Sequence, residues 1–154
     1  MSSKPIRFPF FSLPKTSRKR PLIWLSLENL HDPDGEVTIY PALLDTGADS
    51  SAVPKSLCRN LKHVFEAGTS PSTTGGVGEC RVRTFCHTNR VTILESIEGD
   101  WKPGVGNKVF SPIEFSLNFI DQNLPFILLG QADFLNLFEY TQNRSEGWFS
   151  LRRL

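Results

Sequence analysis

Short apolar runs separated by Gly, Pro, Asp or Asn recur along this chain, and long amphipathic stretches are few. Apolar and polar residues alternate in several of these runs, and others are continuously apolar, as in half-buried and fully buried strands respectively. The pattern therefore predicts a mostly β protein, with strands at residues 22–27, 36–44, 91–97, 108–120, 126–129 and 148–151. A turn at residues 31–35 joins the first two strands, and residues 98–107 form a polar excursion that contains glycine.

Two segments have a helical pattern instead. In residues 53–64, Pro54 suits a first helical position, and Leu57, Leu61 and Val64 recur on one face. Residues 131–140 predict a short helix whose core side carries Phe134, Leu135 and Phe138. We expect these helices to pack on the strands.

The stretch at residues 42–50 is the most informative one, because an apolar strand ends there in an acid, a hydroxyl and a glycine. Residues 42–44 are Ala-Leu-Leu, followed by Asp45, Thr46 and Gly47. Gly47 permits a tight turn, and Thr46 can bond back to the backbone, so the Asp45 carboxyl would stand at the edge of an apolar environment. Such carboxyls have movable pKa values and can perform proton chemistry. An ordinary Asp-x-Gly turn after a strand also fits these residues.

A second segment strengthens the first interpretation. Ile127-Leu128-Leu129-Gly130 is an apolar strand that ends at glycine, and Asp133-Phe134-Leu135 follows it. Together with Leu43-Leu44-Asp45-Thr46-Gly47-Ala48, this segment resembles the two hallmarks of the retropepsin-like aspartic proteases, in the same order. The resemblance covers roughly residues 21–154 and implies a closed, barrel-like, mostly β fold with one or two short helices. A helical segment directly after the loop is more frequent in the cellular and bacterial members than in the compact viral ones.

The resemblance also implies a mechanism. Two carboxyls one water apart share a proton and hydrolyse a peptide bond, and this chain has one Asp-Thr-Gly. The active site would therefore lie at a homodimer interface, with Asp45 of each copy as the acid/base and Thr46 and Gly47 as its support. Ala48 stands where pepsins usually have serine, so one donor to the carboxyls is missing. We therefore expect a mildly acidic rate optimum, and a maximum below pH 3 would contradict this.

Further roles follow from the same resemblance. Ala48 and Asp49 would contact an extended peptide substrate, and so would a Gly-rich flap formed by Gly75, Gly76, Val77 and Gly78. An ordinary exposed hairpin also fits the flap segment. In viral members, the aspartate that corresponds to Asp49 pairs with an arginine. Gln131 occupies the position of that arginine in this chain. Phe149 and Leu151, in the last strand, would contribute to the dimer interface.

The 154 residues are enough for one domain with a substantial core, and charge divides the chain unevenly. Residues 1–20 contain six Lys and Arg and no acid, which leaves 17 − 6 = 11 basic and 16 acidic residues in 21–154, or −5. We therefore expect a basic, Pro- and Phe-rich arm at 1–20 and a protease domain at 21–154. The arm is most simply a solvated tail, although a nucleic acid or membrane surface also attracts such charge. Its residues 8–11 could add a strand to the domain or bind in the cleft.

Three cysteines without a CxxC pair indicate reduced thiols and a cytoplasmic location. Cys80, Cys86 and His87 do not have a recognised zinc spacing, and no metal or organic cofactor is implied. We expect no nucleic-acid or membrane partner. Two other functions stay open: a non-catalytic dimerisation or peptide-binding module of the same fold, and a Ser-His-Asp or Cys-His hydrolase that draws on His31, His63 or His87.

Overall fold

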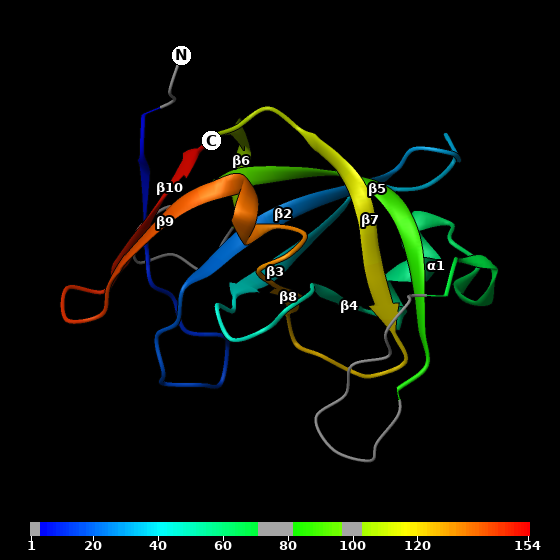
Figure 1. Cartoon of the computed structure of the whole chain (residues 1–154), viewed down its shortest axis with the longest axis horizontal. Coiled ribbons are helices and arrows are strands. Elements are labelled where there is room, and N and C mark those ends of the chain that lie inside the picture. The colour runs from blue at the N-terminus through cyan, green and yellow to red at the C-terminus, as the bar shows by residue number, and fades with distance from the viewer. Residues whose placement is uncertain (1–3, 71–81, 97–102) are drawn as a thin grey trace.

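Six strands close into a barrel in the computed structural model of the chain, which describes residues 4–70, 82–96 and 103–154. The order around the barrel is β2-β3-β8-β4-β7-β5, and β2 pairs with β5 to close it (Figure 1). The barrel strands are β2 (Leu22–Asn29), β3 (Thr38–Leu44), β4 (Ala52–Pro54), β5 (Thr84–Ser96), β7 (Ile113–Ile120) and β8 (Ile127–Leu129). β6 (Pro103–Lys108) adds to β5. The expected closed, barrel-like, mostly β fold is confirmed.

A second sheet of three strands packs beside the barrel. Its order is β1 (Ile6–Pro9), β10 (Trp148–Arg153) and β9 (Phe138–Asn143), all antiparallel. Part of the basic arm is therefore a strand of this sheet, as one of the two alternatives for residues 8–11 predicted. Phe8 is 2% exposed and its ring stacks on Phe149 at 5.1 Å between centroids.

The core forms because the apolar positions of β2, β3, β7 and β8 fall inside the barrel. Leu25, Leu27, Leu117, Phe119 and Ile127 are all completely buried there. The core continues without a break under the three-stranded sheet, through Phe134, Phe149 and Leu151. Burial of this apolar surface is the main favourable contribution to folding.

The helical segment after the loop is shorter than predicted. It consists of the 3-10 helix η1 (Lys55–Leu57) and the four-residue helix α1 (Cys58–Leu61), with Pro54 as the residue before η1. Lys62 has a φ of 58° and ends the helix in the left-handed conformation. Leu57 and Leu61 are buried as predicted, but Val64 lies beyond this end and is 67% exposed. The prediction for Val64 was wrong because the helical periodicity stops before it.

The predicted helix at residues 131–140 is wrong. The structure has a turn, the single 3-10 turn η3 (Leu135–Leu137), and then strand β9. Pairing of β9 with β10 along its whole length, from Phe138 opposite Arg153 to Asn143 opposite Trp148, replaces the hydrogen bonds of a helix. Phe134, Leu135 and Phe138 are nevertheless buried, because spacings of one and four positions also suit a turn that runs into a strand.

Other boundaries shift less. β6 occupies residues 103–108, where a polar excursion was predicted, and β7 begins at Ile113 rather than at 108. The last strand extends to Arg153. A further 3-10 helix, η2 (Phe65–Ala67), follows α1. None of the helices in the described part of the chain has the length or the apolar composition to cross a bilayer.

Candidate active site

Asp45 stands at the end of β3, where the barrel brings two buried strands side by side. β3 and β8 run parallel, with Leu44 opposite Leu129. The N–H of Asp45 donates to the Leu129 carbonyl at 3.0 Å, and the N–H of Leu44 donates to the Pro21 carbonyl at 3.0 Å. The two predicted hallmark segments are therefore direct neighbours in the fold, and Asp45 leaves the sheet from a fixed backbone position.

The Asp45 carboxylate makes the turn that follows it. Its Oδ1 accepts the N–H of Gly47 at 2.9 Å, and the backbone carbonyl of Asp45 accepts the N–H of Ala48 at 3.2 Å. A Cβ on Gly47 would lie 3.3 Å from the same Oδ1, so the absence of a side chain lets the carboxylate approach this closely. Asp45 is half-buried, whereas Thr46 and Gly47 are exposed. Within the described residues, Oδ2 of Asp45 has no hydrogen-bond partner and stays available for chemistry.

The prediction that the Thr46 side chain bonds back to the backbone of the turn is wrong. Its hydroxyl makes no hydrogen bond within the described part of the chain, and its backbone carbonyl instead accepts the Nε2 of Gln131 at 2.8 Å. The Gln131 amide thus holds the tip of the Asp45 loop from outside. The side chain of Thr46 is left exposed on the surface of the loop.

Residues 48–51 are joined to residues 130–133 by a set of hydrogen bonds that we call the loop clamp. The N–H of Gln131 donates to the Ala48 carbonyl at 2.9 Å, and the N–H of Ala132 donates to the Asp49 carbonyl at 2.7 Å. Ser51 is 1% exposed and donates to Asp133 twice, from its N–H at 2.9 Å and from Oγ at 2.7 Å. The same Oγ accepts the N–H of Gly130 at 3.1 Å. Asp133 is therefore a structural residue that holds the clamp.

Gly130 is required by the clamp. A Cβ at this position would lie 2.5 Å from the carbonyl carbon of Ser50 and 2.6 Å from its oxygen, which are backbone atoms that cannot swing aside. The glycine of the second hallmark thus serves close approach of two backbones. It brings the chain after β8 against the chain after β3.

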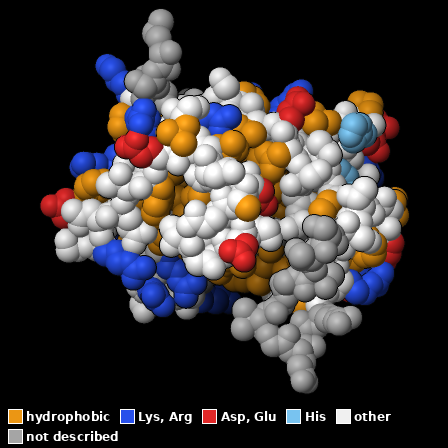
Figure 2. All heavy atoms as spheres, in the orientation of Figure 1, with side chains coloured by type: hydrophobic (Ala, Val, Ile, Leu, Met, Phe, Trp, Pro, Cys, Tyr) orange, Lys and Arg blue, Asp and Glu red, His pale blue; other side chains and the backbone are white. Residues whose placement is uncertain are grey.

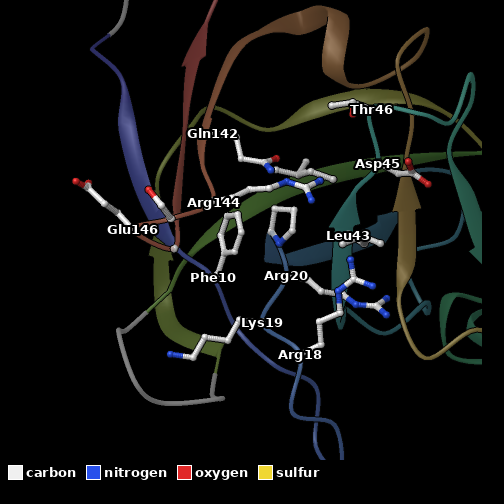
Figure 3. A pocket seen from close by; sticks show the side chains of 14 residues that line it. Phe10, Arg18, Lys19, Arg20, Leu43, Asp45, Thr46, Gln142, Arg144 and Glu146 are labelled. Carbon is white, nitrogen blue, oxygen red and sulfur yellow. The ribbon is translucent and has the colours of Figure 1, made fainter.

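A cavity of about 600 Å³ opens beside the Asp45 loop (Figure 3). Its walls come from three parts of the chain: the end of β3 with Asp45 and Thr46, the arm around residues 18–21, and the hairpin between β9 and β10. Phe10 and Leu43 contribute apolar surface, and Arg144 comes from the hairpin. This volume lies in the range of about 300–1,000 Å³ typical of ligand sites.

Several predicted site residues are not brought into this arrangement. Gly75, Gly76, Val77 and Gly78, the predicted flap, lie outside the described residues. Phe149 and Leu151 have no exposed surface and pack in the core of their own chain, so these side chains cannot form the predicted dimer contact. The side chain of Asp49 is exposed at the loop.

The alternative hydrolase site finds little support among the described side chains. The rings of His63 and His87 stack at 4.5 Å, but His63 Nε2 lies 2.7 Å from Asn89 Oδ1 and His87 Nε2 lies 3.0 Å from the Phe65 carbonyl. Burial raises the pKa of Cys58 to about 11, which disfavours the reactive thiolate. Among the residues that the structure describes, no group of three His, Cys, Asp or Glu side chains is placed to hold a metal ion.

Sequence reasoning missed Ser51, the bonds of Asp133 and the arm residues that line the cavity. Nothing in the local pattern distinguishes Ser51 from Ser50, because its partners lie 79 and 82 positions away. The cations of the arm form a charge run in the sequence, but their place beside Asp45 depends on the bridge between Phe11 and Arg20 and on the hydrogen bond from Leu44 to Pro21.

Comparison with known proteins finds similarity in structure alone. No protein-family model matches the sequence, and no curated protein sequence matches it. A retropepsin-like aspartic protease from Rickettsia conorii superposes with a TM-score of 0.52 at 14% identity, over 99% of this chain and 95% of that chain. The EIAV protease in complex with an inhibitor superposes with a TM-score of 0.42 at 24% identity, over 78% of this chain and 88% of that chain. The retroviral protease-like domain of Ddi1 from Leishmania major superposes with a TM-score of 0.46 at 12% identity, over 87% of this chain and 94% of that chain.

Proposed function

We propose, from the premise that this chain has the retropepsin-like fold, that it is an aspartic endopeptidase which hydrolyses peptide bonds as a homodimer. The observation that carries the proposal is the setting of Asp45. Its carboxylate is half-buried at the end of a barrel strand, one oxygen accepts the Gly47 N–H, and the other oxygen has no partner among the described residues. A carboxylate oxygen without a partner can exchange a proton with a water molecule or a substrate, which supports a role of Asp45 as general acid/base.

The chemistry needs a second carboxyl. One carboxylate removes a proton from a water molecule while the other, protonated, donates to the carbonyl oxygen of the scissile bond. Two carboxyls this close cannot both ionise, so the pair holds one proton between them. Each chain carries one Asp45 loop, and a two-fold axis beside this loop supplies the second from another copy.

The neighbouring residues have supporting roles in the proposal. Thr46, exposed beside Asp45, faces the second loop across the two-fold axis. Gly47 holds the carboxylate through its N–H. Ala48 and Asp49 contact the substrate backbone, and Gly75, Gly76, Val77 and Gly78 cover the substrate as a flap. The loop clamp keeps this edge rigid, which lowers the cost of positioning the substrate.

The experiment is cleavage of a random peptide library between pH 3 and 7, with the full chain and the Asp45→Asn variant at equal concentrations. We expect the rate to fall by a factor of about 10²–10⁴ in the variant. Asp34→Asn, in the turn after β2, is the control and should cleave like wild type. Specific activity should also rise with protein concentration until all of the protein is dimeric.

Each other result has a clear meaning. Equal cleavage by wild type and Asp45→Asn would show that Asp45 is only a turn residue. No cleavage by a confirmed dimer would favour the binding-module alternative. Full activity in a confirmed monomer would refute the shared site.

A further inference from the structure

The cavity beside Asp45 concentrates positive charge. Four cationic side chains line it: Arg18, Lys19 and Arg20 from the arm, and Arg144 from the hairpin between β9 and β10. Apart from Asp45 itself, Glu146 is the acid in the lining. Figure 3 shows these side chains around the cavity, and Figure 2 shows Lys and Arg side chains gathered on the side where the arm loop lies in Figure 1.

These cations form no ion pair within the described residues, although the Arg20 guanidinium lies 5.9 Å from the ring centroid of Phe126. Three arginines elsewhere in the chain do form ion pairs. Arg83 pairs with Glu66, Arg90 with Glu28 and Glu114, and Arg152 with Glu139. The four cations of the cavity have no ion pair in the described part of the chain. Glu146 accepts the Nε1–H of Trp148 at 2.7 Å. The cavity therefore has uncompensated positive charge, which attracts anions.

Backbone hydrogen bonds tie the end of the arm to the chain around the cavity. Arg20 and Phe11 exchange two backbone hydrogen bonds, of 3.0 Å and 2.7 Å. The N–H of Phe10 donates to the Gly147 carbonyl at 2.8 Å, which ties the arm to the hairpin. The Pro21 carbonyl accepts the N–H of Leu44, one residue before Asp45. Backbone hydrogen bonds thus connect the arm to the hairpin and to the strand before the Asp45 loop, and a preorganised backbone reduces the entropy that is lost on binding.

The size and position of the cavity favour a peptide as the ligand. Asp45 and Thr46 belong to its lining, so a ligand that fills the cavity touches the loop of the proposed acid/base. A volume of about 600 Å³ holds a few side chains. The remainder of the protein is acidic, with a charge of −5 outside the arm, which disfavours a long polyanion such as nucleic acid.

We propose that this cavity binds acidic side chains of the peptide substrate beside the scissile bond, so that the enzyme prefers Glu or Asp at those positions. The inference rests on the proposed endopeptidase function. An extended peptide advances about 3.3 Å per residue, so acidic residues within about three positions of the scissile bond reach the cations. Arg18, Arg20 and Arg144 can each bind a carboxylate in a bidentate manner.

The test compares peptide pairs that share a cleavable sequence from the library and differ only by Glu or Gln within three positions of the scissile bond. Wild-type full chain should show a KM about three- to fivefold lower for the Glu peptide, with similar kcat. The Arg18→Gln/Arg144→Gln variant should lose this ratio, and Arg59→Gln, exposed on α1 away from the cavity, should keep it. High salt should reduce the preference in wild type.

A second measurement separates this inference from the proposed function. Binding of labelled library peptides that differ only by Glu or Gln, chosen whether or not they are cleaved, to Asp45→Asn protein is followed by fluorescence anisotropy, with a single-stranded oligonucleotide as competitor. Tighter binding of the Glu peptide, lost in the double arginine variant, supports the acidic site even if the protein cleaves nothing. Cleavage with equal KM for both peptides overturns the inference about the acidic site but still supports the proposed endopeptidase function.

Two further results would also overturn it. An oligonucleotide that displaces the Glu peptide at lower concentration than the peptide itself would assign the cavity to nucleic acid. A double arginine variant that changes the dimerisation constant, measured by sedimentation, but keeps the Glu preference would assign the cavity to the subunit interface.

Discussion

At the scale of single residues, two glycines and one acid define the candidate site. Asp45 positions its own carboxylate by accepting the Gly47 N–H, and Gly130 lets the chain after β8 touch the backbone of Ser50. In both glycines the requirement is space, since neither has a positive φ. The fold therefore requires glycine at positions 47 and 130 for steric reasons that are independent of catalysis.

We expect Gly130→Ala to destabilise the fold by at least about 2 kcal/mol, because its Cβ would lie within 2.6 Å of the backbone of Ser50. Gly147→Ala is the matched control. It strains a φ of 74° but meets no atom within 4 Å, so it should cost only about 1 kcal/mol. Urea denaturation of both variants measures the difference, and equal losses would argue against the close approach.

His63 makes stability depend on pH. Burial lowers its pKa below the ordinary value of 6.5; the hydrogen bond with Asn89 opposes this shift, and the neighbouring His87 adds to it. The unfolded chain therefore binds a proton at a pH where the folded chain does not, so stability is greatest above about pH 6.5 and falls as the pH drops below it. His63→Gln should show a smaller fall in Tm between pH 7.5 and 5 than wild type shows. A Tm profile of His63→Gln as steep as that of wild type would contradict this assignment.

At the scale of elements, the loop clamp connects the ends of β3 and β8. Ser51 occupies the centre because its hydroxyl donates to Asp133 and accepts from Gly130. The clamp explains how two strand ends, far apart in the chain, produce one rigid edge at Asp45. It also accounts for Asp133, which accepts hydrogen bonds and does not face the Asp45 loop as a second catalytic acid.

Ser51→Ala should cost about 1–3 kcal/mol, because it leaves the buried Gly130 N–H without an acceptor and removes one donor from Asp133. Ser56→Ala, exposed in η1, should stay within about 0.5 kcal/mol. Thermal unfolding compares the two. Ser51→Ala should also reduce the rate of peptide cleavage by more than the loss of folded protein explains. Unchanged stability of Ser51→Ala would show that the loop clamp contributes little to folding.

At the scale of the whole molecule, the two chain ends form one sheet within the same chain. β1 pairs with β10, and Phe8 covers Phe149 in the continuous core. The side chains of Phe149 and Leu151 in the last strand are consequently unavailable to a partner. A homodimer of this protein would have to join through other surfaces, and the exposed Asp45 loop is one of them.

Phe8→Ala should destabilise the protein by about 3–5 kcal/mol, because its ring is 2% exposed and is part of the core. Phe10→Ala, at a half-buried position of the same arm, should cost clearly less. Chemical denaturation with two probes, tryptophan fluorescence and circular dichroism, measures both. A negligible effect of Phe8→Ala would mean that the arm is a detachable tail.

The sequence by itself determined the elements whose signals are local. The apolar runs predicted β2, β3 and β8, and the abrupt change from Leu44 to Asp45 marked the candidate site. Local patterns carry this information because a strand buried on one face alternates apolar and polar residues, whereas a strand buried on both faces is continuously apolar. Burial of Phe134 and Leu135 was predictable for the same reason, even where the element type was wrong.

Only the tertiary structure decided how these elements meet. β9 is a strand because β10 supplies its hydrogen bonds, and Val64 is exposed because Lys62 ends the helix. Ser51, Asp133 and the four cations of the cavity acquire their roles from partners many residues away. Such contacts leave no periodic signal, since they depend on which strands pair and in which register, and the barrel as a whole sets both.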